Sequence, residues 1–180
     1  MKKLNEIYLK YQSPEGHGDK GTAHTYIGEY ERLLEPYRNN STVLEIGLSH
    51  GESLEMWSEY FLNSTIYGVD ITDMNLRRLI ELNKYNIIID DATTENFINS
   101  LGDIMFDVII DDGSHLLTHQ ISSFLLLKNK MKSNGIYIIE DVVNIDYVKN
   151  IFEKLHNNIE IVDNRHIKNR HDDVLIIYKF

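Results

Sequence analysis

The chain has 180 residues, and its 28 acidic and 18 basic side chains give a formal net charge of −10. It contains no cysteine, which excludes a disulfide scaffold, a thiolate nucleophile and a metal site with cysteine ligands. The acidic balance argues against nucleic acid as the main partner. No apolar run approaches the ~20 residues that cross a bilayer, so we expect no membrane partner. Met1–Leu4 is not followed by an apolar signal segment, which favours a cytoplasmic location.

Short β-branched runs alternate with amphipathic stretches along most of the chain. The runs are 42–47, 65–70, 86–90, 106–111, 135–140, 159–163 and 174–180. The amphipathic stretches are 52–62, 74–84, 94–101, 117–131 and 145–156. This alternation predicts an α/β fold with a mostly parallel sheet and helices on both faces. The polar segment 164–173 is too short for a helical crossover, so the last two strands are predicted to be antiparallel.

The first forty residues do not follow this alternation of strand and helix patterns. Residues 13–21 form a glycine-rich polar segment, and a helix is predicted from about Thr22 to Glu35, before Pro36. The segment is either a surface connection or a lip over a ligand site. We expect a single domain over 1–180, in which residues 1–40 act as a lid and residues 41–180 form a Rossmann-like core.

A glycine turn follows the first predicted strand. Gly47 and Gly51 lie between that strand and the next helix, and Asp70 ends the second strand. In nucleotide-binding α/β folds an acid at that position accepts hydrogen bonds from ribose hydroxyls. Glu45 would repel a pyrophosphate and attract a cationic ligand, which favours S-adenosylmethionine over NAD, as does Ser49 in place of a glycine. The alternative is a simple turn beside a solvated acid.

Acidic doublets follow three of the predicted core strands: Asp90-Asp91, Asp111-Asp112 and Glu140-Asp141. The carboxyl ends of such strands form the ligand-binding edge of an open α/β sheet. If the fourth and fifth strands are neighbours, the acids of the last two doublets crowd together and require a proton or a cation. Oxygen ligands suit Mg²⁺. Separate helix N-caps are the alternative for each acid.

His115 stands three residues beyond Asp112, beside this acidic cluster. An imidazole with a pKa near ~6.5 can accept a proton at neutral pH, so His115 is a candidate general base. A surface histidine is the alternative, and it is the interpretation we prefer for His24, His50 and His119.

Four stretches of the chain resemble the class I S-adenosylmethionine-dependent methyltransferases, and more closely the metal-dependent sugar O-methyltransferases of macrolide biosynthesis (the mycinamicin type). These are Asp19–Thr22 with His24 and Tyr26, Val43–Gly47, Asp111–His115, and Glu140-Asp141.

The resemblance implies a seven-stranded sheet of order 3-2-1-4-5-7-6 with the seventh strand antiparallel. It implies S-adenosylmethionine and Mg²⁺ as cofactors, Asp112, Glu140 and Asp141 as metal ligands, and His115 as the base. Asp70 matches a ribose-binding position and Asp91 a position near the adenine. The full set of expected cofactor-binding residues is Glu45, Gly47, Gly51, Asp70, Asp91, Asp111, Lys20 and Tyr26.

We therefore expect O-methyl transfer to a sugar or sugar-containing small molecule. The N-terminal domain of the macrolide enzymes has no counterpart in these 180 residues, which leaves the acceptor and the oligomeric state open, a homo-oligomer included. Tyr11, Tyr26, Trp57 and the 164–173 loop are candidates to line the acceptor pocket. Three alternatives remain open: a hydrolytic or hydroxylase-like enzyme on the same fold, a cofactor-binding protein without turnover, and a nicotinamide enzyme.

Overall fold

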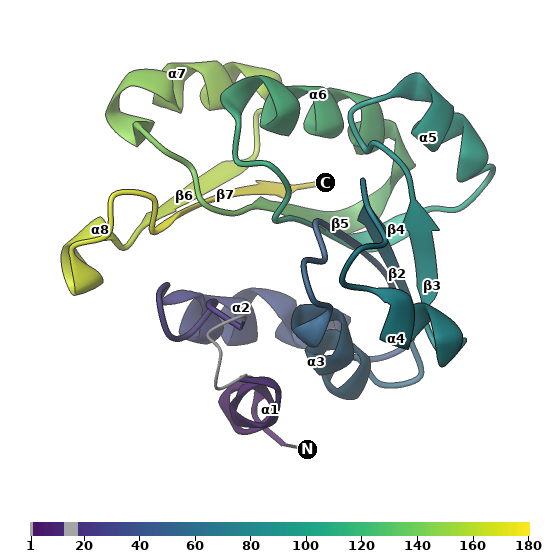
Figure 1. Cartoon of the computed structure of the whole chain (residues 1–180). Coiled ribbons are helices and arrows are strands. Elements are labelled where there is room, and N and C mark those ends of the chain that lie inside the picture. Colours follow the sequence, from purple (N-terminus) through teal and green to yellow (C-terminus); the bar gives the residue numbers. More distant parts are fainter. Residues whose placement is uncertain (1, 13–17) are drawn as a thin grey trace.

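A computed structural model describes residues 2–12 and 18–180, so part of the glycine-rich segment, residues 13–17, lies outside the described residues. Seven strands form one sheet of order β3-β2-β1-β4-β5-β7-β6. Figure 1 shows α5, α6 and α7 over one face of this sheet and α1 to α4 on the other side. This is the predicted α/β architecture and the predicted strand order.

The strands are β1 Thr42–Ile46, β2 Thr65–Asp70, β3 Asn86–Ile89, β4 Phe106–Asp111, β5 Met131–Ile139, β6 Ile159–Asp163 and β7 Val174–Lys179. The first five run parallel to one another, and β7 pairs antiparallel with both β5 and β6. The predicted antiparallel pair at the end of the chain is therefore confirmed.

The α-helices are α1 Leu4–Tyr11, α2 Tyr26–Leu34, α3 Glu52–Tyr60, α4 Arg77–Glu81, α5 Glu95–Ser100, α6 Leu117–Leu127, α7 Ile145–Leu155 and α8 Arg165–Lys168. Two 3₁₀ turns, Glu35–Tyr37 and Lys128–Lys130, follow α2 and α6. Across residues 2–12 and 18–180, no helix has the length and apolar character needed to cross a membrane.

Two of these helices, α1 and α8, were not predicted, and α2 begins later than expected. The chain between Asp19 and Thr25 forms turns instead of helix, because the amides of Thr22 and His24 both donate to the carbonyl of Asp19. The amide of Tyr26 donates to the carbonyl of Lys20, and α2 starts there. This turn keeps Lys20 and His24 off the helix surface and directs them toward the sheet.

Alternating side chains of the central strands form a separate hydrophobic core on each face of the sheet. Val108 and Ile110 of β4 belong to the core with α1, α2 and α3, whereas Ile109 belongs to the core with α5, α6 and α7. Strands with apolar residues on both faces must be covered on both sides, as the continuous apolar runs of the sequence indicated.

The register of the parallel strands fixes where the acidic doublets meet. Ile46 of β1 pairs with Asp111 of β4, and Asp111 pairs with Ile139 of β5. The residues that follow these positions, Asp112 and Glu140, therefore leave the sheet side by side. The amide of Glu140 donates to the carbonyl of Asp111 and keeps the ends of β4 and β5 in register.

Candidate active site

Two adjoining cavities lie at the carboxyl ends of the parallel strands. The larger has a volume of about 430 Å³ and the smaller about 280 Å³, and both are lined by Gly47, Asp70 and Gly113. The two cavities together have the size of an ordinary small-molecule site. Their position at the carboxyl edge is where open α/β sheets bind ligands.

The turn after β1 separates the two cavities and depends on Gly47. Its φ of +83° is in the left-handed region, and a Cβ at this position would lie 2.1 Å from the carbonyl oxygen of Asp112. Asp70 holds the same turn, because its Oδ2 accepts hydrogen bonds from the amides of Leu48 at 2.8 Å and Ser49 at 3.2 Å. The turn is therefore fixed by β2 on one side and by the end of β4 on the other.

Lys20 is the cation at the centre of the acidic cluster. Its side chain is 4% exposed, and Nζ lies 2.6 Å from Oδ2 of Asp112, 2.5 Å from Oε1 of Glu140 and 3.8 Å from Oε1 of Glu45. Burial opposes the charge of Lys20, but Asp112 and Glu140 outweigh it and hold the pKa of Lys20 well above its ordinary value. Oε1 of Glu140 also accepts a hydrogen bond from the hydroxyl of Tyr30.

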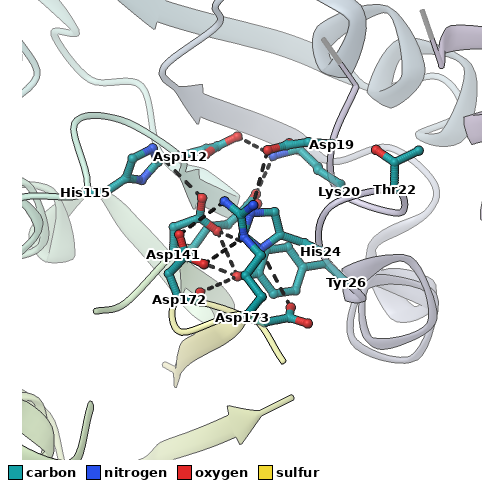
Figure 2. A network of polar contacts seen from close by, with 12 residues as sticks. Asp19, Lys20, Thr22, His24, Tyr26, Asp112, His115, Asp141, Asp172 and Asp173 are labelled. Carbon is teal, nitrogen blue, oxygen red and sulfur yellow. Dashed lines mark hydrogen bonds and ion pairs between the residues drawn. The ribbon is translucent and has the colours of Figure 1, made fainter. Parts of the chain in front are cut away.

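Asp141 lies between two histidines, as Figure 2 shows. Its Oδ1 is 3.3 Å from Nδ1 of His24, and its Oδ2 is 4.0 Å from Nε2 of His115. Burial, together with the charge of Asp112, raises the pKa of Asp141 to about 7. Asp141 and His115 both have positive φ, of 54° and 56°, a backbone conformation that is uncommon for residues other than glycine and clusters at functional sites.

Three of the side chains fit a divalent cation. One ligand atom each from Asp112, His115 and Asp141 lies within 4.8 Å of the other two. The charge of Asp112 helps to raise the pKa of Asp141, and a cation between the two carboxylates would relieve that repulsion. Glu140 adjoins this set, but its Oε1 is occupied by Lys20 and Tyr30.

A second set of side chains that could hold a metal ion contains Asp19, His24 and Asp141, whose ligand atoms also lie within 4.8 Å of one another. His24 is buried, and among the described residues neither of its ring nitrogens has a hydrogen-bond partner. Burial lowers the pKa of His24, which favours the neutral ring. Oδ1 of Asp173 lies 3.7 Å from Nδ1 of His24 and accepts a hydrogen bond from the amide of Thr25, whose hydroxyl donates to Oδ2.

His115 lies at the mouth of the larger cavity with a side chain that is 40% exposed. Its Nδ1 is buried without a partner among the described residues, so Nε2 is the nitrogen left to meet a ligand.

The acids of the smaller cavity are Asp70, Asp90, Asp91 and Asp111. Burial raises the pKa of Asp111 to about 7, although Gly113 and Tyr137 donate hydrogen bonds to it. Asp91 is engaged locally: Oδ1 accepts from the amide and hydroxyl of Thr93, and the hydroxyl bond is the main cause of a lowered pKa.

Three of the expected cofactor-binding residues are placed behind the cavities, not among the described residues that line them. Glu45 is fully buried and accepts hydrogen bonds from Trp57 and Ser53, and its burial raises its pKa to about 7. The buried hydroxyl of Tyr26 donates to Oδ1 of Asp141 at 2.8 Å. Gly51, with φ of +86°, is the N-cap of α3.

The cavity lining includes residues that sequence analysis did not select. Tyr8, Asp19 and Met56 line the larger cavity, and His119 and Gln120 the smaller one. Leu4, Ile7 and Tyr8 are spaced as one face of a helix, a signal that could have identified α1. Of the acceptor-pocket candidates, Tyr11 lines the larger cavity and Trp57 is buried, whereas Arg165, His166, Arg170 and His171 line a separate hollow.

Comparison with protein families matches residues 27–169 to the family described as FtsJ-like methyltransferase. Among curated proteins, the chain is 36% identical over 138 residues to the 8-demethyl-8-alpha-L-rhamnosyl tetracenomycin-C 2'-O-methyltransferase of Streptomyces olivaceus, which covers 70% of this chain and 35% of that protein. It is 34% identical over 149 residues to the mycinamicin VI 2''-O-methyltransferase of Micromonospora griseorubida, covering 77% of this chain and 36% of that protein. The chain thus spans about a third of the length of these relatives.

Among solved structures, the MycE methyltransferase from the mycinamycin biosynthetic pathway, in complex with Mg and SAH, superposes with a TM-score of 0.74. The sequence identity is 26%, and the match covers 99% of this chain and 55% of that chain.

Proposed function

Since the chain belongs to the FtsJ-like methyltransferase family, we propose that it transfers a methyl group from S-adenosylmethionine to a hydroxyl of a sugar or sugar-containing small molecule. The relatives above are named as O-methyltransferases acting on a rhamnosyl tetracenomycin and on mycinamicin VI. The observation that carries the proposal is one cleft in which the Gly47 turn adjoins Asp112, His115 and Asp141.

The cleft fits S-adenosylmethionine on both sides of that turn. The acids along it complement a ligand that carries an ammonium group and a sulfonium, and Asp70 stands where it can accept a ribose hydroxyl. The smaller cavity, with Asp91 and Ala92, would take the adenine. Bound S-adenosylmethionine supplies an electrophilic methyl group, so the protein has mainly to align donor and acceptor.

Asp112 and Asp141, with the adjoining Glu140, would hold Mg²⁺ beside this cofactor. A bound divalent ion would lower the pKa of an acceptor hydroxyl and orient it. His115 then takes the hydroxyl proton at Nε2, the nitrogen that faces Asp141. The buried Tyr26 steadies Asp141 through a 2.8 Å hydrogen bond from its hydroxyl.

The N-terminal residues would act as one wall of the acceptor site. Tyr8 and Tyr11 of α1, with Asp19 and Lys20 beyond it, line the larger cavity opposite the Gly47 turn. Aromatic side chains over an acidic site suit a polar ring with apolar faces, such as a sugar.

The direct test is to supply methyl-labelled S-adenosylmethionine and Mg²⁺ with a panel of glycosylated metabolites and free sugars. We expect labelled product from at least one glycosylated acceptor and loss of product on chelation. Stabilisation by the cofactor without product from any acceptor would favour a cofactor-binding protein instead, and product that survives strong chelation would remove the metal role.

A further inference from the structure

The ammonium of Lys20 occupies the position of a cation inside the acidic cluster. It contacts one oxygen each of Asp112 and Glu140, two of the three proposed metal ligands, at 2.6 and 2.5 Å. These contacts join residues 92 and 120 positions apart, and Lys20 is almost completely buried. A divalent ion bound to these two carboxylates would lie beside the ammonium, so the two cations would repel each other and compete for the carboxylate oxygens.

Glu45 offers the ammonium a second partner. Its Oε1 lies 3.8 Å from Nζ of Lys20, so a shift of about 1 Å closes the gap to hydrogen-bond distance. The Glu45 carboxylate is fully buried, and its described hydrogen bonds come from neutral donors, Nε1 of Trp57 at 3.0 Å and Oγ of Ser53 at 2.9 Å. A buried carboxylate gains from a paired cation.

The backbone around Lys20 is held firmly, which confines such a shift to the side chain. Nζ of Lys168 donates to the carbonyls of Gly21, Thr22 and His24, and the carbonyl of Lys20 accepts from the amide of Tyr26. The four-carbon stem of a lysine can swing its ammonium by this distance without backbone movement.

We propose that Lys20 is a displaceable internal counter-ion: it neutralises Asp112 and Glu140 while the site holds no divalent ion, and metal binding drives its ammonium onto Glu45. The inference rests on the proposed metal role of Asp112, Glu140 and Asp141. It adds that Lys20 competes with the metal ion, and that the Glu45 carboxylate becomes the new partner of the displaced Lys20 ammonium.

The competition is tested by titrating the full-length, metal-free chain with Mg²⁺, using calorimetry for affinity and tryptophan fluorescence as a second readout. Trp57 is the only tryptophan in the chain and donates directly to Glu45, so it reports the arrival of the ammonium. We expect Mg²⁺ to change the fluorescence of the wild type. In Lys20→Met, Mg²⁺ should bind at least about tenfold more tightly and leave the fluorescence unchanged.

Glu45→Gln gives an independent and opposite expectation. Without the second carboxylate the displaced ammonium has no ionised partner, so Mg²⁺ should bind more weakly than to the wild type. Lys132→Met is the matched control, because Lys132 also pairs with a carboxylate, Asp107 at 2.7 Å, but at the other end of the sheet. This control should bind Mg²⁺ like the wild type.

The proposal is overturned if Lys20→Met binds Mg²⁺ no more tightly than the wild type. If that variant does not fold, unchanged affinity in Glu45→Gln overturns it instead. If neither the wild type nor any variant binds Mg²⁺, both this inference and the proposed metal role are wrong. If the wild type binds Mg²⁺ and Lys20→Met does not bind it more tightly, only the role of Lys20 is wrong.

Discussion

The carboxylate of Asp70, the last residue of β2, accepts a 2.8 Å hydrogen bond from the amide of Leu48 in the turn after β1. The end of one strand thereby sets the backbone that would face the cofactor. Because Asp70 also lines both cavities, the same side chain shapes the turn and contributes acceptor oxygens to the cleft.

Replacing Gly47 by alanine should remove this turn. The added Cβ would meet the backbone of Asp112 at 2.1 Å, and the φ of +83° is strained for any residue with a Cβ. We expect a loss of stability of about 2 kcal/mol or more and at least tenfold weaker binding of S-adenosylhomocysteine, from thermal unfolding and calorimetry. Gly28→Ala is the control: apart from its chain neighbours and the backbone of its own helix, no described atom lies within 4 Å of its Cβ position, so binding should persist.

His115→Ala should abolish methyl transfer while cofactor affinity changes little. The imidazole is assigned to proton removal from the acceptor, and general-base catalysis contributes roughly 10²–10⁴-fold to a rate. Turnover with an active acceptor and calorimetry with S-adenosylhomocysteine measure the two effects separately. His171→Ala removes a strongly exposed histidine and should leave both unchanged. Normal turnover in His115→Ala would refute the base assignment.

Asp111 should make the metal-free protein less stable as the pH rises. Its folded-state pKa of about 7 lies above the ordinary value of 3.8, so the folded chain binds more protons in that interval and its stability falls between about pH 4 and pH 7. Glu45 and Asp141 have raised pKa values of about 7 as well, so we expect Asp111→Asn to reduce this slope without removing it, and to gain about 2 kcal/mol above pH 7, in urea unfolding followed across pH. Equal slopes in the variant and the wild type would show that Asp111 does not contribute to the pH dependence. Asp103→Asn, at an exposed position, should retain the slope.

Glu59 should stabilise the packing of α1 at pH values above 4.5, and this stabilisation should be lost in acid. Its carboxylate accepts from Lys10, Lys2 and Tyr11, and the hydrogen bond from Lys10 is the main reason that its pKa falls to about 2. A lowered folded-state pKa gives stability that is present above the ordinary value of 4.5 and is lost as the pH falls toward 2.

Hydrogen exchange of the α1 amides in Glu59→Gln should therefore be faster than in the wild type at pH 6. The free energy of opening of α1 should differ less between Glu59→Gln and the wild type as the pH is lowered toward 2. An unchanged difference would contradict this ion-pair role. The exposed Glu81→Gln gives the comparison for loss of a surface charge.

Much of the fold follows from local sequence. The seven strands and six of the eight α-helices lie at or near their predicted positions, because β-branched runs and amphipathic periods are read directly from the order of residues. The antiparallel end was also predictable, since the loop 164–173 is too short to cross the sheet. The short α1 and α8 were missed, as helices of this length owe their stability to packing and not to propensity.

The sequence by itself determined that acidic doublets and His115 would stand at the carboxyl edge of a parallel sheet, because strand direction and sheet edge follow from the alternation of elements. Only the tertiary structure decided which of these acids contact the same cation, the ammonium of Lys20. Lys20 reaches Asp112 and Glu140 across 92 and 120 residues, and Glu45 lies behind the cleft with Trp57. Such partnerships depend on how the N-terminal turns pack against the sheet, and no local pattern of residues encodes that contact.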